Sequence, residues 1–314
     1  MKKYIINKII GMIPPFIAVV TLVFVIVHLI PGDPVTVMLG MDANPEVAEA
    51  LRIKYGFNKP ILQQYFDWVG NLLHGDLGES YMLKESVGKL ITQRLGRSGQ
   101  ICIIGIVLTL VIAIPAGIAC ALTHNTFTDL GISTITIILI SIPSFWLAIM
   151  LSYEFGYKIP IFPVFGYTPL KEDFWKSIWS TMLPAISVAA MMAASTTRLL
   201  RTSLLEVLDE DYILLARTKG CSEFRTIFVH GLRNASIPVF TVVAMQIASL
   251  LGGVVVIERV YTFPGMGMLF MNAIADRDYP LLQGCMLVFA SVVIIINFLT
   301  DILYAVLDPR IRLS

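Results

Sequence analysis

The sequence predicts an all-α, polytopic membrane protein with six transmembrane helices. Hydrophobic residues make up 56% of the 314 residues and charged residues only 14%, whereas a soluble domain carries about 25% charged residues. The mean hydropathy of +0.79 indicates the same class. Every charged residue lies outside six long apolar stretches, and a helix of roughly 20 apolar residues crosses the hydrocarbon of a bilayer. Because backbone groups in lipid must pair within their own segment, we expect these stretches to be helices.

The predicted spans have uncharged interiors, and charged residues such as Arg97 and Asp129 lie at their boundaries. In the third span, Pro143 is expected to kink the helix, and Phe145 and Trp146 are expected to pack it rather than to contact a substrate. The six spans cover residues 9–30, 98–122, 130–153, 178–197, 237–257 and 281–300.

The first span has the basic flank of a signal peptide, with Lys2, Lys3 and Lys8 before it. Its apolar run is longer than the roughly 7–15 residues of such a signal, and no small-x-small cleavage site follows. The Pro31-Gly32-Asp33-Pro34 segment is typical of a turn that ends a helix. We therefore expect this span to be retained.

The predicted organisation has three parts. Residues 1–30 form an N-terminal tail and the first span, residues 31–97 an extracytoplasmic loop, and residues 98–314 a core with five spans. The core includes a cytoplasmic loop over residues 198–236. The long first loop is expected to fold into a small cap of helices, with Tyr65, Phe66 and Trp68 as the core of that cap.

Both termini are predicted to be cytoplasmic. The N-terminal tail has three lysines and no acidic residue, and the C-terminal tail contains Arg310 and Arg312; cytoplasmic segments carry an excess of such residues. The basic residues of the loop 31–97 count against this orientation, but long loops cross a membrane largely regardless of charge.

Several kinds of site are missing from the sequence. It has no Gly-x-x-x-x-Gly-Lys-Ser/Thr loop for a nucleotide, and its four histidines and four cysteines have no metal-ligand spacing. The net charge of +1 does not indicate a nucleic-acid partner. The uncharged span interiors offer no site for a coupling ion, which ion-driven carriers commonly place at mid-membrane. The energy for transport against a gradient is thus expected to come from another protein.

The loop 198–236 is the place where such a protein could attach. The acidic run 209–211 begins a predicted short helix, Lys219 lies at its basic end, and Gly220 is placed as a left-handed terminator. Ser222 can then cap a second short helix. Such a pair is either a docking element or a solvated linker on the membrane surface, and the pattern alone favours neither. The apolar residues at helical spacing along one face of the second helix are Phe224, Ile227, Phe228 and Leu232.

This loop resembles the coupling-loop signature of ABC-importer permeases, which reads Glu-Ala-Ala, three residues, Gly, nine residues, Ile-x-Leu-Pro. Here Ala216, Gly220 and Leu232 match, and the departures are similar to the dipeptide/oligopeptide permease branch, which includes glutathione and nickel importers. The segments that resemble the branch motifs in the loop are Glu210-Asp211-Tyr212, Ala216-Arg217-Thr218-Lys219-Gly220 and the run from His230 through Arg233 to Pro238. Those elsewhere are Pro31-Gly32-Asp33-Pro34, Gly75-Asp76-Leu77-Gly78, the run 203–208, Phe263-Pro264-Gly265-Met266-Gly267, Arg277-Asp278-Tyr279-Pro280 and the run 308–312.

The resemblance implies a non-catalytic permease subunit with the ABC type I importer architecture, in the inner membrane of a bacterium. It implies as partners a second homologous permease, two ABC ATPase subunits that bind ATP and Mg²⁺, an extracytoplasmic solute-binding protein and the lipid bilayer. This chain then needs no cofactor of its own. The substrate is expected to be a dipeptide or oligopeptide, with nickel or a metal chelate as the alternative and a stand-alone secondary transporter as the alternative of a different class.

The resemblance also assigns two groups of candidate residues. The residues expected to couple the ATPases to the spans are Glu210, Asp211, Tyr212, Ala216, Arg217, Lys219, Gly220, His230 and Arg233. A turn after the fifth span is either a gate, a contact for the binding protein or a purely structural feature, and its residues are Phe263, Pro264, Gly265 and Gly267.

Overall fold

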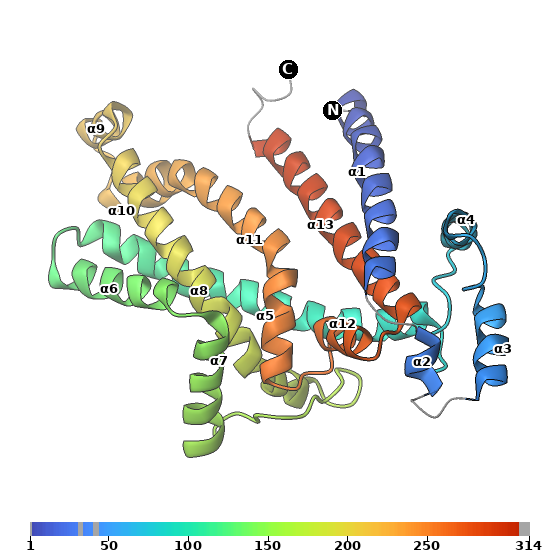
Figure 1. Cartoon of the computed structure of the whole chain (residues 1–314). Coiled ribbons are helices and arrows are strands. Elements are labelled where there is room, and N and C mark those ends of the chain that lie inside the picture. Colours follow the sequence, from blue (N-terminus) through green and yellow to red (C-terminus); the bar gives the residue numbers. More distant parts are fainter. Residues whose placement is uncertain (1, 31–33, 40–43, 308–314) are drawn as a thin grey trace. The chain divides into compact units, whose positions relative to one another are not determined.

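The computed structural model describes residues 2–30, 34–39 and 44–307, and its elements are shown in Figure 1. Within these residues every regular element is a helix, and the β pairing consists of one isolated bridge between Glu79 and Ser86. The all-α prediction is confirmed. Five helices are long and apolar enough to cross a membrane, and a bent pair of helices can form the sixth span.

The unbroken candidate spans are longer than the apolar stretches in the sequence. The reason is that hydropathy marks only the part of a helix that fits the hydrocarbon, and the backbone pattern continues beyond it. In α8, for example, the Asp173 side chain accepts a hydrogen bond from the backbone N–H of Lys176 and so caps the helix well before residue 178. These five helices are α1 (Lys2–Leu29), α5 (Val87–Leu122), α8 (Phe174–Leu208), α11 (Leu232–Val260) and α13 (Tyr279–Leu307).

The third span is broken rather than continuous. Helix α6 (Phe127–Ser141) and helix α7 (Ser144–Ser152), which continues as the π-helix η1 (Tyr153–Lys158), meet at 105°. Ile142 and Pro143 are both extended at the break, because proline lacks the N–H that a helix needs and pushes the preceding residue out of the helical region. The predicted kink at Pro143 is confirmed.

Phe145 and Trp146 differ from their prediction. Their side chains are 48% and 46% exposed in this chain, so they do little to pack the third span against its neighbours. They follow the bend directly, where the chain departs from the direction of α6. Hydropathy could not separate a residue that faces a neighbouring helix from one that faces outward.

Two compact units divide the chain. The first consists of residues 1–98 and 264–295, and the second of residues 99–263 and 296–314. The boundaries therefore fall inside α5 and α13 and next to Phe263. The short helices of the first unit are α2 (Pro34–Leu39), α3 (Pro45–Tyr55), α4 (Ile61–Leu73) and α12 (Met266–Ala275).

The segment 31–97 contains the short helices α2, α3 and α4, which we call the cap. Tyr65 and Trp68 of α4 lie against Phe24 of α1, with ring centroids 5.2 and 5.7 Å apart. Phe66 is 67% exposed, so the prediction that all three aromatic residues form the core of the cap is wrong for Phe66. A helix turns by about 100° per residue, so Phe66 cannot share one face with the adjacent Tyr65.

In the second unit, α8 packs against α6, α7 and α11. Its buried face is rich in serine, threonine and alanine, and small residues let helices approach closely in a membrane. Gly117 of α5 shows how close the approach is, since a Cβ atom there would lie 2.9 Å from the side chain of Leu200. The remaining elements of this unit, α9 (Asp211–Thr218), α10 (Glu223–Arg225) and η2 (Thr226–Gly231), lie between α8 and α11 in the sequence.

Candidate functional site

The predicted loop 198–236 is shorter in the structure, because α8 continues to Leu208 and α11 begins at Leu232. Between these two helices the chain forms a helix–glycine–helix turn, as the sequence predicts. Helix α9 ends at Thr218, Lys219 is its C-cap, and Gly220 follows at φ +82°. The backbone N–H of Gly220 donates to the carbonyl of Arg217, and that of Cys221 donates to the carbonyl of Ala216. This left-handed ending suits glycine because glycine has no Cβ to clash there.

The second helix of the loop is irregular. Ser222 caps α10 with its hydroxyl, as predicted, but after one turn the chain continues as the π-helix η2 before α11 begins. A π turn holds more residues than an α turn, so it rotates the residues that follow it. The predicted stripe is therefore split: Phe224 and Phe228 are 70% and 39% exposed, whereas Ile227 and Leu232 are half-buried.

One face of this loop is fixed to the spans. Ile213 of α9 is fully buried. The side-chain amide of Asn234 in α11 donates to the Tyr212 hydroxyl at 2.8 Å. Gly231 is buried beside Leu204 and Leu208 of α8, and a Cβ atom added there would lie 3.3–3.4 Å from their methyl groups. Helix α9 is thus tied to α11 by a hydrogen bond, and η2 packs against α8.

The other face of the loop is exposed and apolar. Leu214 and Leu215 are 60% and 54% exposed, and Phe224 stacks on Phe228 with ring centroids 4.5 Å apart. An ion pair crosses the glycine turn between Arg217 and Glu223, with Nε and Oε1 3.1 Å apart. We call this face, consisting of Leu214, Leu215, Phe224 and Phe228, the outer face of the loop.

Most candidate coupling residues of the loop are exposed. The structure brings the motif around Tyr212 next to the motif around His230, because Asn234 bonds both the Tyr212 hydroxyl and the His230 carbonyl. The exposed members are Glu210, Asp211, Tyr212, Arg217, Lys219, Gly220 and Arg233, and the half-buried members are Ala216 and His230.

The second group of candidate residues, around Phe263 and Pro264, is largely buried. Phe263 is 2% exposed and meets Tyr167 edge to face at 5.1 Å. The Pro264 carbonyl accepts hydrogen bonds from Arg94 at 3.0 Å and from Arg97 at 3.3 Å. These contacts hold Phe263 and Pro264 in place, and the three roles considered for this group stay predictions.

The predicted turn after the fifth span does not extend to Gly267, because helix α12 begins at Met266. Gly265 caps α12, and the backbone N–H of Met266 donates to the Ser98 hydroxyl at 2.7 Å. Both glycines are buried. The apolar residues that follow Gly267 continue the helix, so the two glycines mark its start.

A buried ion pair was missed by sequence reasoning. Arg201 of α8 donates two hydrogen bonds to Asp129 of α6, at 2.6 and 2.7 Å, and the Asp129 side chain is 6% exposed. The Ser133 hydroxyl and the Asn125 N–H also donate to this carboxylate. Asp129 stands at the boundary of a predicted span and Arg201 lies a few residues beyond another, but no local pattern pairs residues 72 positions apart.

Two motifs of the first unit also meet around one carboxylate. Asp278, which is 1% exposed, accepts hydrogen bonds from the Ser80 hydroxyl and from the backbone N–H groups of Tyr81, Met82 and Leu281. Burial raises the pKa of Tyr81 above its ordinary value, and the Asp278 carboxylate raises it further. Asp278 thus fastens the end of the cap to the start of α13.

Comparison with known proteins agrees with this architecture. The family model "Binding-protein-dependent transport system inner membrane component" matches residues 113–313, and its N-terminal companion, "Binding-prot-dependent transport system membrane comp, N-term", matches residues 1–102. The oligopeptide transport system permease protein AppB of Bacillus subtilis is 38% identical over 99% of this chain and 100% of its own length. The glutathione transport system permease protein GsiC of Escherichia coli K12 is 36% identical over 99% of both chains. The chain therefore belongs to the family of inner-membrane components of binding-protein-dependent transport systems, the permease subunits of ABC importers.

Proposed function

We propose that this chain forms half of the translocation pathway of an ATP-driven importer of dipeptides or oligopeptides. The similarity to AppB and GsiC supports a peptide substrate, since one is named for oligopeptides and the other for glutathione, which is itself a tripeptide. Both matches extend over essentially the whole chain, so the similarity includes the cap as well as the spans.

The observation that carries this proposal is the combination of an exposed apolar outer face and a fixed inner face on the loop 198–236. The outer face offers two leucines and two phenylalanines to a cytoplasmic partner. The inner face connects the loop to α8 through Gly231 of η2 and to α11 through the Tyr212–Asn234 hydrogen bond. A partner that moves α9 would tilt the two helices together, which is a hinge-type switch of access.

The partners in this proposal are a second homologous permease, two ATPase subunits and an extracytoplasmic solute-binding protein. ATP and Mg²⁺ bind to the ATPases, and this chain catalyses no reaction. The two termini and the loop 198–236 lie in the cytoplasm, and the cap lies outside.

The test is reconstitution of this chain with its partner permease, ATPases and binding protein in proteoliposomes. We expect trialanine to stimulate ATP hydrolysis and to accumulate inside only with hydrolysable ATP. Uptake that persists without the ATPases would contradict the importer. Uptake of Ni²⁺ in place of peptides would contradict the substrate class and favour the metal alternative.

A further inference from the structure

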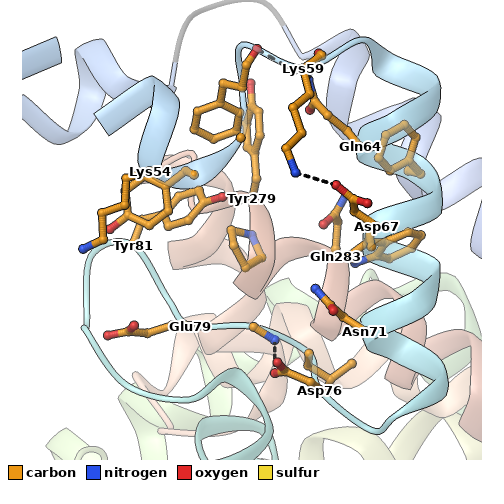
Figure 2. A pocket seen from close by; sticks show the side chains of 18 of the residues that line it. Lys54, Lys59, Gln64, Asp67, Asn71, Asp76, Glu79, Tyr81, Tyr279 and Gln283 are labelled. Carbon is orange, nitrogen blue, oxygen red and sulfur yellow. Dashed lines mark hydrogen bonds and ion pairs between the residues drawn. The ribbon is translucent and has the colours of Figure 1, made fainter. Parts of the chain in front are cut away.

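A cavity of about 400 Å³ lies in the first unit, bounded by α1, the cap and the start of α13. Figure 2 shows the side chains that line it. Its size is within the range of small-ligand sites, which is roughly 300–1,000 Å³. The residues that line the cavity lie outside the loop 198–236.

Gln283 is the most informative residue of this cavity. Its side chain comes from α13 and is 7% exposed, and Figure 2 shows it facing the cavity. It forms no hydrogen bond with any residue in the described part of the chain. The amide atoms are not sealed from the cavity, because in the described residues the side-chain atom that is both buried and without a partner is Oγ1 of Thr226. The Gln283 amide therefore opens onto the cavity with its donors and its acceptor unused by the protein, and these groups are available to a ligand.

The groups around Gln283 form a firm frame. Lys59 and Asp67 are paired at 2.7 Å. The Gln64 amide donates to the Lys59 carbonyl at 2.8 Å, and its oxygen lies 3.3 Å from Nε2 of His28. These polar groups already have hydrogen-bond or ion-pair partners within the protein, so they stabilise the lining of the cavity. Asn71 of α4 adds a second amide on the same lining.

The chemistry of the lining suits a peptide. The NH2 group of a side-chain amide can donate to the C=O of a peptide group, and the amide oxygen can accept from the peptide N–H. Aromatic residues, among them Trp68, Tyr81 and Tyr279, supply an apolar wall. Outside the Lys59–Asp67 pair, the lining has two carboxylates, those of Asp76 and Glu79, and one ammonium group, that of Lys54, so one negative charge is in excess. A positively charged amino terminus fits that excess.

We propose that this cavity binds the N-terminal part of a short peptide, with Gln283 bonded to its first peptide group and the amino terminus near Asp76 and Glu79. The proposal rests on the proposed function for its substrate class and adds a binding site outside the spans.

The experiment is calorimetric titration of the full chain in lipid nanodiscs with trialanine. Gln283→Met keeps the volume of the side chain and removes its amide. We expect this variant to bind trialanine about five- to tenfold more weakly, as for a lost hydrogen bond. Gln63→Met is the matched control, because Gln63 is an exposed amide of the same cap that does not line the cavity. N-acetyl-trialanine, which lacks the charged amino terminus, should also bind more weakly than trialanine.

Thermal unfolding separates a ligand site from a structural role. Gln283 has no hydrogen bond to lose, so Gln283→Met should unfold at the same temperature or higher; a lower temperature would indicate a structural role and overturn the proposal. Equal trialanine affinities of the wild type and Gln283→Met would also overturn it, as would saturable binding of maltose in place of trialanine. A further result would also overturn the proposal: trialanine does not bind to the wild type, and Gln283→Met binds the peptide-free binding protein more weakly than the wild type does. Peptide uptake by the full complex is measured separately. The binding-site proposal can therefore be contradicted while the importer proposal is supported, and the importer proposal can be contradicted while the binding-site proposal is supported.

Discussion

Asp129 and Arg201 join α6 to α8 through a two-point ion pair, with Nε 2.6 Å from Oδ1 and Nη2 2.7 Å from Oδ2. The carboxylate is buried and the guanidinium is one-quarter exposed. Both hydrogen bonds are charge-assisted and parallel, a geometry that arginine forms with carboxylates more rigidly than lysine can. Arg201 lies in the last turns of α8, which ends at Leu208.

Removing one partner of this pair should destabilise the protein strongly. Asp129→Ala leaves a partly buried guanidinium without its partner, and breaking a buried pair costs about 3–5 kcal/mol. The measurement is the free energy of unfolding in detergent. The double variant Asp129→Leu with Arg201→Leu should recover most of the loss. Lys158→Gln, which breaks the exposed pair with Glu154, is the control and should change stability by about 0.5 kcal/mol or less. An Asp129→Ala variant as stable as this control would contradict the prediction.

Gly220→Pro should separate ATP hydrolysis from transport. Proline holds φ near −65°, whereas Gly220 is at +82° and uses its N–H in the turn. The change is confined to the loop, so the spans should insert and the complex should assemble. We expect peptide uptake per ATP hydrolysed to fall severalfold in proteoliposomes.

Gly166→Pro provides the matched control for that variant. Gly166 is also at positive φ, +92°, in the loop between η1 and α8. Proline at this position is also incompatible with the positive φ, but the change lies outside the loop 198–236, so coupling should be retained. Normal coupling in Gly220→Pro would remove the assigned role of the glycine.

Phe224→Ser should weaken binding of the ATPase subunits. Phe224 is 70% exposed, so its loss should change the stability of this chain little. An aromatic residue central to an interface contributes about 2 kcal/mol or more when truncated, which corresponds to roughly a 30-fold weaker complex. Affinity would be measured by titrating labelled ATPase onto the permease in nanodiscs. Phe127→Ser, at a phenylalanine that is 94% exposed on α6, is the control. If both variants bound equally well, the outer face would not be the docking surface.

Asp278→Asn should loosen the cap. Four donors converge on this carboxylate. In the asparagine variant an NH2 group replaces one carboxylate oxygen, and that group cannot accept the hydrogen bonds that the oxygen accepted. We expect faster amide hydrogen exchange in residues 78–86 and about 1–3 kcal/mol lower stability. The neighbouring exposed Asp276 gives the control Asp276→Asn, which should leave exchange in the cap unchanged. Unchanged exchange in Asp278→Asn would show that the carboxylate is dispensable.

The positions of the spans and of the glycine turn could be predicted because their causes are local. The transfer of an apolar stretch into lipid depends on the composition of that stretch. The end of α9 depends on one residue, Gly220, whose freedom at positive φ needs no neighbour. The kink at Pro143 is local in the same way.

The sequence by itself therefore determined the fold class, the number of apolar stretches and the helix–glycine–helix pattern of the loop. The tertiary structure decided what is paired and what is exposed: Asp129 with Arg201, Asp278 with Ser80, Phe224 outward and Phe263 inward. The physical reason is that hydrogen bonds and burial depend on which helices are neighbours in space. Residues 72 or 198 positions apart leave no mark of their contact in local hydropathy or backbone propensity.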